Sequence, residues 1–164
     1  IGSGLTLTGS GPYTLTASGG SGTTIRSAKL AANLTTASAT FADMAGVTLT
    51  FTPTKSTVTA FFSSSFDINT FDQCIVFFRI LKDGTSVGGV SSVAQDFDED
   101  YFGSDYMTAA GSAAINGFPI SVTPGVSTTI KIQWRRTSLW GGATVRCQAS
   151  SSSDASHAVL TIFE

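Results

Sequence analysis

Acidic and aromatic side chains are concentrated in one stretch of this sequence. Residues 96–106 read DFDEDYFGSDY and contain five of the eleven acidic residues of the chain. Carboxylates accept hydrogen bonds from hydroxyl groups, and aromatic rings offer a flat apolar face with, in tyrosine, a polar edge. We therefore expect this stretch to contact a ligand, most directly a sugar, through Asp96, Asp98, Asp100, Tyr101 and Tyr106.

The same acidic stretch also invites comparison with a calcium-binding loop. An EF-hand loop that began at Asp96 would need glycine at its sixth position, where this sequence has Tyr101. The stretch is therefore not an EF-hand. A calcium site of another kind and a solvated acidic loop stay open beside the ligand-contacting loop.

Trp140 is the second candidate contact. It lies in the segment SLWGG (138–142), outside the alternating pattern of the neighbouring segments, and glycines that follow it let another molecule approach the backbone closely. A ring packed into its own loop is the alternative. His157 is the single histidine and has no partner at a spacing typical of a metal site or a catalytic base. We expect no enzyme, no cofactor and no metal site.

The composition narrows the classes of protein to consider. The chain has 164 residues, with 9 basic and 11 acidic side chains, a balance that argues against nucleic-acid binding. No apolar run approaches the roughly 20 residues of a membrane-spanning helix, so we expect no membrane insertion. Cys74 and Cys147 are too few for a disulfide framework, and we expect free thiols, with a disulfide as the alternative. Because the first residue is Ile1 and not Met, we expect a piece of a longer chain.

Short strands must position these candidate residues. Many Phe, Val and Thr residues favour strands, and turn sequences separate the segments at short intervals. This pattern predicts an all-β antiparallel sandwich or jelly roll over residues 27–164, preceded by a neck or linker over residues 1–26. The expected strands are Thr24–Lys29, Thr35–Asp43, Val47–Thr52, Thr57–Phe66, Gln73–Lys82, Ser86–Val93, Ser112–Val122, Thr128–Arg136, Ala143–Ala149 and His157–Phe163.

Some of these strands are apolar on both faces. In the segment 75–81, Val76, Phe78 and Ile80 point one way, while Ile75, Phe77 and Leu81 point the other; the segment 159–163 behaves similarly. In a two-layer sandwich the second apolar face needs another cover, because a large exposed apolar patch is unusual for a soluble monomer. We expect both segments to face the threefold axis of a homotrimer.

Several segments together resemble a known family. The opening is similar to the neck segments of phage tail fibres, and the remainder resembles the small C1q/TNF-like heads that end trimeric fibres in phages and some bacteria. The segments that carry this resemblance are GSGLTLT (2–8), FADMAGVTLTFTP (41–53), VFFRILKDG (76–84), VTPG (122–125) and TIKIQWR (129–135). Residues 96–106 match no pattern of the family, so a ligand specificity cannot be carried over.

This resemblance implies a homotrimeric jelly-roll head at the tip of an extracellular fibre, on a virion tail or a bacterial surface. Its partners would be two copies of itself and a cell-surface glycan or another receptor, and its function would be attachment to a target cell. A purely structural trimerisation or assembly domain is one alternative. A carbohydrate-active enzyme or a monomeric carbohydrate-binding module is another.

Overall fold

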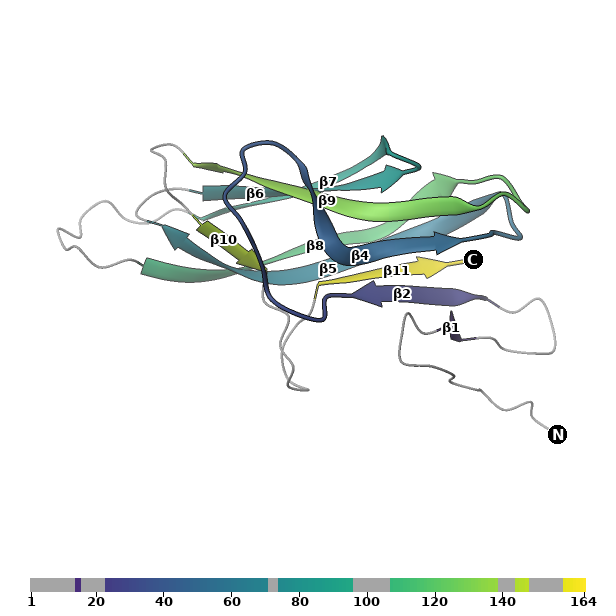
Figure 1. Ribbon diagram of the computed structural model, residues 1–164, viewed down its shortest axis with the longest axis horizontal. Helices are drawn as coiled ribbons and strands as arrows, with labels where there is room; N and C mark the ends of the chain where they lie inside the picture. Colours follow the sequence, from purple (N-terminus) through teal and green to yellow (C-terminus); the bar gives the residue numbers. More distant parts are fainter. Residues whose placement is uncertain (1–13, 16–22, 71–73, 96–106, 139–143, 148–157) are drawn as a thin grey trace.

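Two antiparallel sheets face each other in the computed structural model (Figure 1). The structure describes residues 14–15, 23–70, 74–95, 107–138, 144–147 and 158–164, and within these ranges it contains strands and turns but no helix. The all-β antiparallel prediction is confirmed. No helix in the described ranges is long and apolar enough to cross a membrane.

Eleven strands make up the two sheets. They are β1 (Thr14–Leu15), β2 (Ile25–Lys29), β3 (Leu34–Thr36), β4 (Ala42–Phe51), β5 (Thr57–Thr70), β6 (Cys74–Lys82), β7 (Thr85–Gln95), β8 (Met107–Ser121), β9 (Thr128–Ser138), β10 (Thr144–Cys147) and β11 (Val159–Phe163). One sheet contains seven strands in the order β1-β2-β11-β5-β10-β3, with β8 on the other side of β5. The other contains four, in the order β4-β9-β6-β7.

The long strand β5 organises the seven-stranded sheet. Along one edge it pairs first with β11, over residues 59–63, and then with β10, over residues 66–69. The strand β2 pairs with β11 in the same way that β3 pairs with β10. The strands β11 and β10 therefore follow one another along the same side of β5, and β2 and β3 lie beyond them. Together with β5 and β8, these strands make the sheet four strands wide, with β1 added at the edge beside β2.

The four-stranded sheet contains a bulge that the sequence pattern did not reveal. We predicted separate strands over 35–43 and 47–52, but the chain breaks earlier, after Thr36, and β4 continues through the middle of this region. Gly46 has a φ of 85°, a conformation that suits glycine, and the register of β4 against β9 shifts between Asp43 and Thr48. The gap that we predicted between two strands is thus a bulge within one strand, at Gly46.

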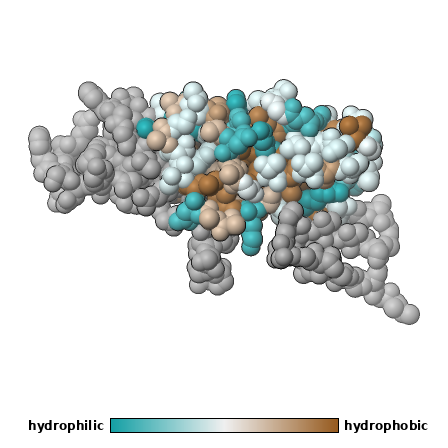
Figure 2. All heavy atoms as spheres, viewed as in Figure 1, coloured by the Kyte–Doolittle hydropathy of each residue, from teal (hydrophilic) through white to brown (hydrophobic). Residues whose placement is uncertain are grey.

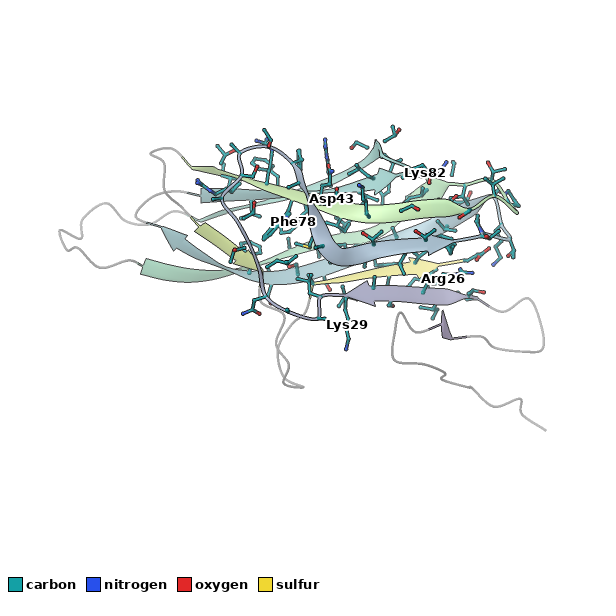
Figure 3. All side chains as sticks on the ribbon, viewed as in Figure 1. Arg26, Lys29, Asp43, Phe78 and Lys82 are labelled. Atoms are coloured by element: carbon teal, nitrogen blue, oxygen red, sulfur yellow. The ribbon has the colours of Figure 1, made fainter. Side chains whose placement is uncertain are left out.

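The core fills the space between the sheets with aromatic and branched aliphatic side chains. Phe78 of β6 is fully buried, and its ring centroid lies 5.3 Å from that of Phe62 and 5.9 Å from that of Phe66, both on β5. Trp134 of β9 stacks on its other side at 6.4 Å. Figure 3 places Phe78 between the two sheets, so one residue joins both layers.

Candidate functional site

Every residue that we predicted to contact a ligand lies outside the described part of the chain. These residues are Asp96, Asp98, Asp100, Tyr101, Tyr106 and Trp140. The structure therefore tests neither the ligand-contacting loop nor the calcium alternative. His157 also lies outside the described residues, and the side chains of Cys74 and Cys147 are not described, although the two cysteines belong to different sheets.

The strand ends that flank the two predicted loops are described, and they lie together. Cys74 pairs with Gln95, the last residue before the acidic stretch, and also with Ser138, which ends the strand before Trp140. On the other sheet, β5 pairs through its final residues with the first residues of β8 and β10. The strands that flank the two loops therefore meet at one end of the sandwich, on either side of β6 in one sheet and of β5 in the other (Figure 1).

At the opposite end of the sandwich, Glu164 joins several strands through hydrogen bonds. Its side chain, only 1% exposed, accepts a hydrogen bond from Arg26 Nη1 at 2.7 Å, from Thr54 Oγ1 at 2.7 Å and from the Lys55 backbone N–H at 3.0 Å, as well as from the Thr54 backbone N–H. The guanidinium of Arg26 also lies 4.6 Å over the Phe51 ring. Glu164 therefore ties β2 and the turn between β4 and β5 to the end of β11.

These contacts set the charge state of Glu164. Burial by itself raises the pKa of the carboxyl, but the hydrogen bonds from Thr54, Arg26 and Lys55 outweigh burial and lower the pKa from 4.5 to about 2. The carboxylate is therefore ionised throughout the neutral range and satisfied by its neighbours. This is a structural cluster, because its oxygens are already occupied and hidden from a ligand.

The outer face of the four-stranded sheet carries two arginines packed on aromatic rings. The Arg79 guanidinium carbon lies 4.0 Å from the centroid of the Phe41 ring, and that of Arg135 lies 4.3 Å from Phe77 and 5.1 Å from Phe41. Such cation–π contacts stabilise by about 0.5–1 kcal/mol each at partly exposed sites. Phe77, on the second apolar face of β6, is therefore partly covered within the chain.

A chain of polar contacts continues from these arginines across the sheet. Arg79 donates to Gln133 Oε1 through Nε at 2.9 Å and Nη2 at 2.6 Å, and Gln133 Nε2 donates to Asp43 Oδ1 at 2.7 Å. Lys131 Nζ donates to Asp43 Oδ2 at 2.7 Å. The hydrogen bonds from Lys131 and Gln133 hold the pKa of Asp43 below its usual value. We call Arg79, Lys131 and Arg135 the cationic platform.

The outer face of the seven-stranded sheet has a different character. Phe61 of β5 is 37% exposed, and its ring contacts that of Phe163 of β11 edge to face, with centroids 5.1 Å apart. Around this pair lie Ile25, which pairs with Phe163 across β2 and β11, and smaller polar side chains, as in the 3.1 Å contact between Ser27 Oγ and Thr161 Oγ1. This face is therefore partly apolar.

The strands β6 and β11 therefore do not share an outer surface. We predicted that both would face one threefold axis, but β6 belongs to the four-stranded sheet and β11 to the seven-stranded sheet. Because the two sheets pack face to face, their outer faces point in opposite directions. The two segments therefore cannot both face one axis through their outer faces, and Phe78 of β6 is a core residue within one chain.

Among the described residues, no group of three or more His, Cys, Asp or Glu side chains comes together to hold a metal ion. No protein-family model and no curated protein matches the chain.

Proposed function

We propose that this chain is the receptor- or glycan-binding head at the tip of a homotrimeric extracellular fibre, where it attaches the fibre to a target cell. The observation that carries the proposal is that the start of β2 and the strands before the two candidate loops lie at opposite ends of the sandwich. Ile25, where β2 begins, pairs with Phe163 at one end, whereas Gln95 and Ser138, which precede the two candidate loops, pair with Cys74 at the other. A head needs this arrangement, with the stalk at one end and binding loops at the far end.

The strand order supports a jelly roll as the form of the sandwich. With β1, β3 and β10 left aside, one sheet has the strand order β2-β11-β5-β8 and the other β4-β9-β6-β7. This is the order that two interleaved Greek keys produce. A jelly roll also agrees with the resemblance to the C1q/TNF-like heads.

The outer face of the seven-stranded sheet is the surface that supports a trimer. Phe61 and Phe163 are its largest apolar side chains among the described residues, and Ile25, which pairs with Phe163, extends the apolar area. Phe61→Asp should dissociate the assembly, because a buried unpaired charge costs several kcal/mol. Val126→Asp, at a residue 54% exposed in a turn, is the matched control and should leave the assembly intact.

Size-exclusion chromatography with light scattering measures this outcome directly. A trimer for the wild type and for Val126→Asp, and smaller species for Phe61→Asp, would support the proposed interface. A monodisperse monomer of the wild type at micromolar concentration would contradict the trimer and favour a monomeric carbohydrate-binding module.

Ligand binding is tested with the trimer on a glycan array and on intact cells. Tyr101→Ala, Tyr106→Ala and Trp140→Ala should weaken binding while leaving the trimer and its melting temperature nearly unchanged, because loop side chains contribute little to a core. Normal binding by all three variants would place the ligand site elsewhere. A trimer that binds no glycan and no cell would favour a purely structural assembly domain.

A further inference from the structure

The cationic platform concentrates positive charge on a molecule whose net charge is −2. Arg79, Lys131 and Arg135 come from the neighbouring strands β6 and β9, and Asp43 is the one acidic side chain that contacts them among the described residues. In Figure 2, hydrophilic residues lie in separate patches, some at the upper edge, where Figure 1 places the four-stranded sheet, and others at the lower edge. Three cations against one anion leave this face locally basic.

The contacts of the platform leave donors available. Arg79 uses Nε and Nη2 for Gln133, so that Nη1 has no acceptor among the described residues. Among the described residues, Arg135 donates only through Nη1, to the Ala39 carbonyl at 3.4 Å and the Thr137 hydroxyl at 3.2 Å. With respect to this part of the chain, Nη2 and Nε of Arg135 are available to an incoming acceptor, and a guanidinium edge of this kind matches a carboxylate or sulfate.

The platform is also held in place before any ligand arrives. The Phe41 and Phe77 rings pack against the two guanidinium groups, and the hydrogen bonds through Gln133 fix Arg79. Because these side chains are already ordered, binding pays less conformational entropy than it would with free surface arginines. The ordered guanidinium groups therefore favour an anion bound at a fixed position over mobile counterions near the surface.

We propose that the outer face of the four-stranded sheet binds an anionic polysaccharide, through Arg79, Lys131 and Arg135. Lys131 and Arg135 are four residues apart in β9, which is about 13 Å at about 3.3 Å per residue. A single small anion cannot contact both, but a polymer with repeated carboxylate or sulfate groups lying along the strand can. This site does not depend on the loops at the end of the sandwich or on the trimer interface.

Retention on immobilised polysaccharides at low salt tests the proposal with the intact chain. The probes are heparin for sulfate groups, polygalacturonate for carboxylate groups, neutral dextran, and polyglutamate as an acidic peptide. The double variant Lys131→Gln/Arg135→Gln should lose at least about tenfold in affinity for the polysaccharide that binds, because it removes two charged hydrogen-bond donors from the face that contacts the polymer. Lys55→Gln, which removes an exposed charge elsewhere, is the matched control.

Asp43→Asn provides an independent readout, since it removes the one acidic side chain beside the platform and should raise the affinity. The proposal would be supported if the wild type and Lys55→Gln bound heparin or polygalacturonate and the double variant did not. The polymer that binds would identify the anionic group. If Lys55→Gln, which removes one charge, lost about half as much binding free energy as the double variant, which removes two, binding would depend on net charge alone and the proposal would be overturned. Absence of binding to either polymer, or stronger binding to polyglutamate, would also overturn it.

Discussion

The substitution Glu164→Gln should lower the free energy of unfolding, because it removes the charge that joins β2 and β11 to the turn between β4 and β5. The carboxylate, 1% exposed, accepts hydrogen bonds from Arg26, Thr54 and Lys55. Its pKa falls from 4.5 in an unfolded chain to about 2 in the folded protein, a difference that corresponds to about 3 kcal/mol of stability. Because Arg26 is 18% exposed and partly screened by water, we expect about 2–3 kcal/mol.

The pH dependence of this contribution follows from the direction of the change. A carboxyl whose pKa is lowered by folding stabilises the protein fully above the unfolded value of 4.5, and this stability is lost as the pH falls towards about 2. Glu164→Gln should therefore be less stable than the wild type near neutral pH. The two proteins should converge in strong acid, where the wild-type carboxyl is also protonated.

Chemical denaturation at a series of pH values measures this difference, at fixed protein concentration because an oligomer gains stability with concentration. Asp43→Asn is the matched control: its carboxyl is 52% exposed, and removing it should change the free energy of unfolding by less than about 1 kcal/mol. A gap between wild type and Glu164→Gln that stays constant from neutral pH to about pH 2 would refute the reasoning.

Two further substitutions test the core. Phe78→Ala should lower the free energy of unfolding by about 3–5 kcal/mol, since the ring is fully buried between the sheets, whereas Phe78→Leu should cost less because it leaves a smaller cavity; chemical denaturation distinguishes them. Gly111→Ala should cost about 1–3 kcal/mol, because its Cβ would lie 2.7 Å from the buried Phe66 ring; an unchanged thermal midpoint would mean that the ring moves away freely.

Strand positions were predictable because alternation is a local signal. In β9 the pattern of Ile130, Ile132 and Trp134 against Lys131 and Gln133 predicts one dry face and one wet face, and the structure buries the first set. The hydrophobic pattern fixes which residues point inward. It does not fix the sheet to which a strand belongs, because that depends on pairing between distant segments.

The polar clusters were not predictable for the same reason. Arg26 and Glu164 are 138 residues apart in the chain, and Arg79 and Gln133 are 54 apart. No spacing rule joins residues at such separations, and their types are common on surfaces. A terminal acid and scattered arginines carry no local signal until strand order brings β2 beside β11 and β6 beside β9.

The contact of Arg135 with Phe77 indicates which sheet would contact a second copy of the chain in the proposed trimer. Phe77 made β6 look as though it needed a partner subunit, but Arg135 lies over that ring from the neighbouring strand. Phe61 and Phe163 have no such cation–π contact among the described residues, and Phe61 stays 37% exposed. The Arg135 guanidinium covers the Phe77 ring, whereas no cation of the described residues covers the Phe61 ring. The contact surface of the proposed trimer therefore belongs on the seven-stranded sheet, which leaves the cationic platform on the other sheet accessible to a ligand.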